Sequence, residues 1–197
     1  MKPQKYLAEL IGTFFLTLAV SLSLLYTAPL ATPLIAGITL GLFVFTVGSI
    51  SGAHLNPAVT IGLASIRKIS LKDAALYVIS QIIGAVLAML AVKALSGQSL
   101  ELIADNKITT GIAEAMGAFI LIFGVSSLVH AKADSDVSGL IVGTSLFLGI
   151  SLATGFSNGV INPAVAIGIN SISAMYLLAP IVGTIVGAWT YKLLIKK

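Results

Sequence analysis

The sequence predicts an all-α integral membrane protein with six transmembrane helices, two re-entrant half-helices and an inverted internal repeat. Three observations lead to this prediction. Apolar residues make up 57% of the chain, charged residues make up 9%, and the mean hydropathy is +1.07, all far from soluble globular averages. Stretches of about 20 residues almost free of charge recur along the chain, and each is long enough to cross a bilayer. The tripeptide Asn-Pro-Ala occurs twice, at 56–58 and 162–164.

Six spans are expected, at roughly 6–26, 32–50, 74–94, 110–129, 138–155 and 174–194. They leave no room for a large soluble domain, so residues 1–197 are predicted to form a single membrane domain. The first apolar run is too long for a signal peptide, and Glu9 interrupts it. The chain has no cysteine, which excludes disulfides and thiolate metal sites, and neither a metal nor a cofactor is expected.

The basic residues predict the orientation of these spans. In a six-span arrangement one side receives Lys2, Lys5, Arg67, Lys68, Lys72, Lys132, Lys192, Lys196 and Lys197, and the other receives Lys93 and Lys107. By the positive-inside rule, both termini of a multi-pass plasma-membrane protein are expected in the cytoplasm. The net charge of +4 then reflects topology, and no basic face remains for nucleic acid.

The two halves of the sequence resemble each other. The segment AELIGTFFL starting at Ala8 aligns with AEAMGAFIL starting at Ala113, and Asn56 aligns with Asn162. Small residues four apart also align: Gly37 and Gly41 with Gly139 and Gly143, and Gly84 and Ala88 with Gly183 and Gly187. Such residues let helix backbones approach closely. The repeats cover about 1–96 and 107–197, and an odd number of spans in each makes the second inverted.

Each Asn-Pro-Ala begins a segment too short to cross the membrane. NPAVTIGLASI and NPAVAIGINSI have about 11 residues each, or roughly 16 Å of helix. Asn56 and Asn162 suit the N-cap, and Pro57 and Pro163 suit the first helical position, followed by Ala58 and Ala164. The preceding segments, SGAH and GFSNG, are expected to be extended, which is tolerated at this depth only in protein or beside a water-filled cavity.

Two half-helices that enter from opposite sides bring their N-termini together near the bilayer centre. Each terminus carries roughly half a positive charge, which repels cations. The amides of Asn56 and Asn162 can cap the helices and still offer N–H donors to the lumen, so that a central water cannot relay protons. The carbonyls of residues 52–55 and 158–161 are expected to serve as unpaired acceptors along the path.

On these motifs the chain resembles the aquaporin, or major intrinsic protein, family. The resemblance rests on SGAHLNPAVT at 51–60, on the second NPA and on AELIGTFFL, QIIGA and APIVGTIVGAW in three spans. It implies one pore per subunit and a homotetramer. It also implies that Glu9 and Glu114 accept hydrogen bonds from the half-helix loops, and we interpret both as structural. His54 is interpreted as a neutral tether of its loop, with a proton-sensitive gate as the alternative.

The sequence departs from the family pattern at the outer constriction. Family members usually carry arginine after the second Asn-Pro-Ala, where this chain has Val165. The resemblance assigns the other three constriction positions to Ala36, Ile150 and Gly159, none of them charged or aromatic. Glycerol-conducting members tend to have aspartate one residue further on, where Ala166 stands. The only arginine in the chain is Arg67, in a loop, so a wide apolar mouth is predicted.

The predicted function is a passive channel for water and small neutral solutes such as glycerol, urea or ammonia. An apolar constriction can instead dewet, which would favour gases or less polar solutes. Another alternative is an intramembrane serine hydrolase, because GFSNG matches G-x-S-x-G and Ser157 could act with His54. No strand precedes this motif, so we do not expect an enzyme. An ion channel would need acidic rings or stacked carbonyls.

Overall fold

The computed structural model describes residues 3–26 and 28–196, in which the regular structure is helical. Six helices are long and apolar enough to cross a membrane, as predicted. They are α1 (Gln4–Leu25), α2 (Thr32–Ser51), α4 (Leu71–Ser96), α5 (Ile108–Val129), α6 (Ser138–Ala153) and α8 (Ala174–Leu194), and α6 reaches this length together with the 3-10 helix before it, as Ser135–Ala153. The short helices are α3 (Pro57–Ser65), α7 (Pro163–Gly168) and the 3-10 helix η1 (Ser135–Val137). Lys2 and Lys197, used above for the orientation, lie outside the described residues.

The long helices are apolar on their outer faces as well as on their inner ones. On α2, Ile38, Leu42 and Phe45 are each more than half exposed, whereas Ala36 and Leu40 are buried. A helix that is hydrophobic all round is stable only where its outer face also avoids water. The outward face of α2 therefore suits lipid or another apolar surface, as a multi-pass membrane protein requires.

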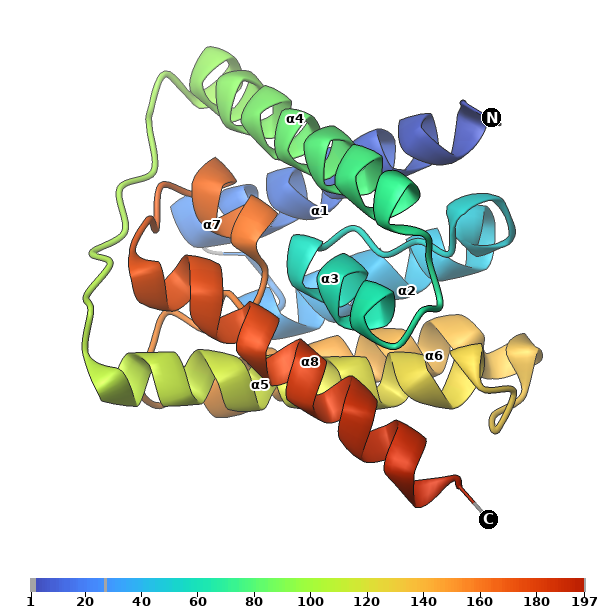
Figure 1. The fold of residues 1–197 in the computed structure, drawn as a ribbon. Coiled ribbons are helices and arrows are strands. Elements are labelled where there is room, and N and C mark those ends of the chain that lie inside the picture. The colour runs from blue at the N-terminus through green and yellow to red at the C-terminus, as the bar shows by residue number, and fades with distance from the viewer. Residues whose placement is uncertain (1–2, 27, 197) are drawn as a thin grey trace.

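The helices pack in two equivalent sets. Helix α1 contacts α4 and α2 in the first half, and α5 contacts α8 and α6 in the second. The short helices cross between the halves, because α3 packs mainly on α8 and α7 packs mainly on α4. Figure 1 shows α3 and α7 between the long helices, with the N-terminal end of α1 and the C-terminal end of α8 on the same side. An even number of spans produces this placement of the ends.

Glycines bring α2 and α6 into backbone contact where the two halves meet. A Cβ added to Gly37 would lie 2.6 Å from the carbonyl oxygen of Gly143. A Cβ added to Gly41 would lie 2.7 Å from the carbonyl oxygen of Gly139. These are the paired small residues of the sequence, and they act as predicted by allowing a close approach.

Two glycine substitutions in α2 test whether the close approach of α2 and α6 depends on glycine. Gly37→Ala is expected to destabilise the protein by about 1–3 kcal/mol, because α2 and α6 must separate to accept the methyl group. Gly48→Ala, also in α2, is the control, since its Cβ would meet only Val44 at 3.8 Å. The control is expected to be neutral or stabilising by up to about 1 kcal/mol, because alanine favours the helix. Thermal unfolding in detergent distinguishes them, and equal melting temperatures would contradict the packing argument.

The half-helices are shorter than the roughly 11 residues expected from sequence. Helix α3 has nine residues and α7 has six. Helix α7 ends early because Asn170 adopts a left-handed φ of 54°, and the Ser171 N–H donates to the Ala166 carbonyl at 2.8 Å. Such a hydrogen bond closes a helix C-terminus. Arg67, with φ of 65°, follows α3 in the same way.

The segments that precede the half-helices also differ from the expected extended backbone. Residues 154–156 form a turn at the end of α6. Further along, φ is positive at Ala53 and Leu55 in the first loop, and at Gly159 and Ile161 in the second. Both loops therefore follow the same irregular path, which the glycine- and serine-rich composition permitted but did not specify.

Candidate functional site

The two half-helices begin with matching caps. The Asn56 carboxamide oxygen accepts from the Ala58 N–H at 2.8 Å, and the Asn162 oxygen accepts from the Ala164 N–H at 3.0 Å. Proline occupies the first helical position in both cases. The N-caps predicted from sequence are therefore present, and each leaves the NH₂ group of its asparagine available.

The remaining donors of these asparagines join the two loops. Asn56 Nδ2 donates to the carbonyl of Ile161 at 3.0 Å, and Asn162 Nδ2 donates to the carbonyl of Leu55 at 2.9 Å. These two carbonyls, expected to be unpaired, are thus satisfied across the centre. An NH₂ group carries two hydrogens, so each asparagine retains one donor for a permeating molecule. The reciprocal pair also holds the two helix tips side by side.

The first re-entrant loop is held by Glu9, which is fully buried. One carboxylate oxygen accepts from the His54 N–H at 2.9 Å and the Ser51 hydroxyl at 2.7 Å. The other accepts from the Leu55 N–H and Gln81 Nε2, both at 2.7 Å. Successive N–H groups converge on one anion here, as they do in backbone nests.

Glu114 holds the second loop in the same way and is also fully buried. It accepts from the Ser157 hydroxyl at 2.7 Å, the Val160 N–H at 3.0 Å and the Ile161 N–H at 2.5 Å. A trans peptide directs its C=O opposite to its N–H. Because the N–H groups face the carboxylates, the carbonyls of the same peptide units face the opposite way.

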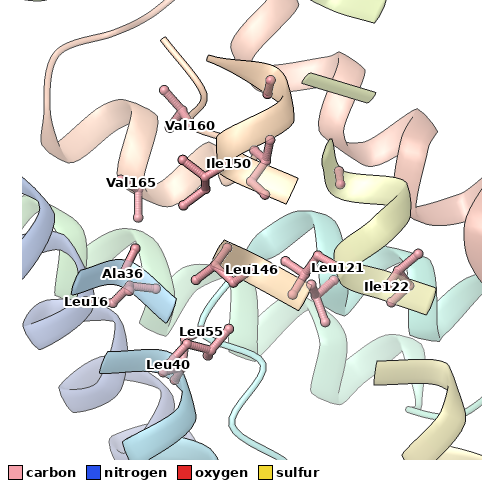
Figure 2. Close-up of a cluster of buried hydrophobic side chains, with 14 of the residues drawn as sticks. Leu16, Ala36, Leu40, Leu55, Leu121, Ile122, Leu146, Ile150, Val160 and Val165 are labelled. Carbon is pink, nitrogen blue, oxygen red and sulfur yellow. The ribbon is translucent and has the colours of Figure 1, made fainter. Parts of the chain in front are cut away.

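A cavity of about 300 Å³ lies beside the second loop and is called the outer cavity, after the constriction positions assigned to it from the sequence. Its walls include all four residues assigned to the constriction, Ala36, Ile150, Gly159 and Val165, together with Asn162. Figure 2 shows Val165, Ile150 and Ala36 around a common space. At about 30 Å³ per molecule the cavity holds roughly ten waters. Its walls at these four positions carry no charge, so a permeating molecule meets mainly apolar surface.

A smaller inner cavity of about 60 Å³ lies beside the first loop and includes His54. The Thr60 hydroxyl donates to the Asn56 carbonyl at 3.0 Å and lies 3.1 Å from His54 Nδ1. The Thr60 oxygen also accepts from Gln81 Nε2 at 3.0 Å, so the His54 ring, Thr60 and Gln81 form one polar cluster. The Tyr77 ring packs edge-on against the imidazole. The ring of His54 thus joins the first loop to Thr60 of α3 and Tyr77 of α4.

The linker between the halves, residues 97–107, is fastened to the second loop. Asn158 Nδ2 donates to the Ile103 carbonyl at 3.0 Å, and the Ser173 hydroxyl donates to the Asp105 carbonyl at 2.8 Å. Hydrogen bonds from the Thr110 hydroxyl and then from Lys107 lower the pKa of the Asp105 carboxyl. Sequence reasoning did not identify this linker as a support of the second loop.

The serine of the G-x-S-x-G motif is not arranged as a nucleophile. Its hydroxyl donates to Glu114 Oε1 at 2.7 Å, lies 3.0 Å from the Ala153 carbonyl oxygen, and accepts from the Gly159 N–H at 2.9 Å. The ring of His54 contacts Thr60 instead. Ser157 therefore supports the loop, as Ser51 does in the first half.

Comparisons with known proteins agree on one family. Residues 2–191 match the family described as Major intrinsic protein. Aquaporin NIP1-2 of Arabidopsis thaliana is 32% identical over 96% of this chain and 74% of its own length. Glycerol uptake facilitator protein-like 6 of Lactiplantibacillus plantarum is 36% identical over 94% of this chain and 95% of its own. The structure of the aquaglyceroporin from Plasmodium falciparum superposes with a TM-score of 0.80 at 24% identity, covering 98% and 96% of the two chains.

Proposed function

Because the chain belongs to the major intrinsic protein family and is a non-enzymatic membrane channel, we propose that it conducts water and small neutral solutes through a wide, apolar outer constriction. The observation that carries this proposal is the outer cavity, in which Ala36, Ile150, Gly159 and Val165 share one space with Asn162. Without an arginine, the mouth has no fixed cation and no guanidinium donors. The names of the relatives include both aquaporins and a glycerol uptake facilitator.

The path in this proposal runs from the outer cavity, past the paired asparagines, to the inner cavity at His54. The free N–H groups of Asn56 and Asn162 orient a passing water, and the loop carbonyls replace its hydration. Helix dipoles repel cations at the same point. Glu9 and Glu114 keep the loops in place and take no direct part in permeation, and His54 tethers its loop in the neutral form.

The proposed assembly is a homotetramer in the plasma membrane, with one pore per subunit and both termini in the cytoplasm. Its support is the family likeness, the apolar outer faces and the common side of the two chain ends in Figure 1. Each subunit is proposed to consist of two inverted repeats, about 1–96 and 107–197, which the paired helix contacts favour.

Stopped-flow measurements on proteoliposomes test the solute range. We expect osmotic water flow and the entry of at least one of glycerol, urea and ammonia to exceed those of protein-free liposomes. The reason is that the mouth lacks the arginine that narrows and charges it in other members. Proteoliposomes that swell in water but exclude all three solutes would contradict the proposal.

A second candidate is a channel for gases or less polar solutes that conducts water poorly. The apolar walls at Ala36, Ile150 and Val165 favour it, since a hydrophobic constriction can dewet. The same measurements decide between the two, because this candidate gives neither fast water flow nor glycerol entry.

A further inference from the structure

The outer cavity has few polar side chains that are free to accept a hydrogen bond from a solute. Among the described residues, those lining it with polar side chains are Thr32, Thr154, Asn158 and Asn162. The Thr154 hydroxyl donates to its own helix, to the Ser151 carbonyl at 2.9 Å. The Asn162 oxygen caps α7, so this residue offers a solute only its remaining N–H donor, and the Thr32 hydroxyl is paired with the Ser23 hydroxyl 3.1 Å away. Asn158 is therefore the remaining candidate for a free hydrogen-bond acceptor in this cavity.

The carboxamide of Asn158 has a defined orientation. Its nitrogen lies 3.0 Å from the carbonyl oxygen of Ile103, which can only accept, so the donor end must face the linker. The second hydrogen goes to the Ser171 hydroxyl at 2.9 Å. Both hydrogens of the amide nitrogen are thus engaged. Within residues 3–26 and 28–196, no group donates a hydrogen bond to the carboxamide oxygen. The side chain is exposed and lines the cavity.

We propose that Asn158 determines which solutes enter the pore, by offering its carboxamide oxygen to a hydroxyl or N–H group of a small neutral solute. This inference rests on the proposed function and names its substrate class: polyols and ureas, which carry several donors. Their donors lose water beside Val165 and Ile150, and an acceptor at the mouth compensates that loss. The linker and Ser171 position the group, so the oxygen stays available without a change of rotamer.

The test compares glycerol, urea and water in proteoliposomes of the wild type, Asn158→Ala and Asn158→Leu. Alanine widens the mouth and leucine keeps a similar bulk, but both remove the oxygen. If the oxygen selects solutes, both variants lose about threefold to tenfold in glycerol and urea permeability relative to water. If the width of the mouth selects solutes, the glycerol and urea permeability of Asn158→Ala instead rises relative to that of water. Ser173→Ala is the matched control, because it breaks the other tie of the linker, to Asp105, without lining the cavity.

The outcomes separate the two proposals. A wild type that conducts none of glycerol, urea and ammonia overturns both the proposed function and the role of Asn158, whereas one that conducts ammonia but neither glycerol nor urea overturns only the role of Asn158. A wild type that conducts them, with unchanged solute-to-water ratios in both Asn158 variants, overturns only the role of Asn158. An equal loss in Ser173→Ala would also overturn it, since the tie of the linker and not the oxygen would then be responsible. A variant enters the comparison only if it elutes as a monodisperse species and keeps the melting temperature of the wild type.

Discussion

Replacing Glu9 with alanine is expected to remove most of the folded protein before any effect on permeation can be measured. The substitution leaves the N–H groups of His54 and Leu55 and the amide of Gln81 without their acceptor, in a site closed to water. Each buried donor left unpaired costs about 1–3 kcal/mol. Fluorescence-detected size-exclusion chromatography in detergent would show a collapsed yield, and thermal unfolding of what remains would show a lower melting temperature.

Two comparisons make this result specific. Glu101→Ala removes an exposed carboxylate in the linker and is expected to change neither yield nor melting temperature. Glu9→Gln keeps one acceptor oxygen and is expected to fall between the wild type and Glu9→Ala. Full recovery of assembled Glu9→Ala with altered permeation would mean that the carboxylate acts on the permeating molecule and not on the loop.

Val165→Arg is expected to reduce glycerol and urea permeability by roughly tenfold, equivalent to about 1.4 kcal/mol in the barrier. Val165 lies one residue after the second Asn-Pro-Ala and lines the outer cavity. A guanidinium there fills part of the space beside Ala36 and Ile150 and adds a fixed positive charge. Any measurable proton flux should fall with it, because a cation would then meet a charge before the helix dipoles. Stopped-flow solute entry and a pH-sensitive dye inside the liposomes measure both effects.

Val165→Met is the matched control for this substitution. It adds bulk without charge or donors, so it is expected to slow glycerol but to leave any proton flux as in the wild type. Glycerol entry through Val165→Arg as fast as through the wild type would show that the mouth is not the selective point. A proton flux that Val165→Arg left unchanged would show that charge at this position does not guard the pore.

The long helices and the helix starts could be predicted from the sequence because each depends on local information. A charge-free run of about 20 residues has few alternatives to spanning a bilayer. Asparagine followed by proline favours a helix start through the cap and the fixed φ of proline. The end of α7 was missed, although Asn170 is a residue type that tolerates the left-handed conformation found there.

The features that were not predicted depend on how distant segments meet. The hydrogen bonds from Asn56 to Ile161 and from Asn162 to Leu55 join residues more than a hundred positions apart. Gln81 was visible in the motif QIIGA, but its bond to Glu9 follows from the packing of α1 on α4. Asn158 carried no sequence signal beyond a polar residue in a loop, since its orientation comes from the linker carbonyl of Ile103.

The exchange of short helices between the halves also bears on biosynthesis. Helix α3 has its largest contact with α8, which is synthesised well after it, whereas α7 finds α4 already made. The first half-helix therefore acquires its principal neighbour only after α8 has been synthesised. Until then its backbone must be kept from lipid by the translocon or by solvent, because unpaired peptide groups are not tolerated in hydrocarbon. Synthesis of α8 and closure of the channel wall around α3 thus belong to the same stage of maturation.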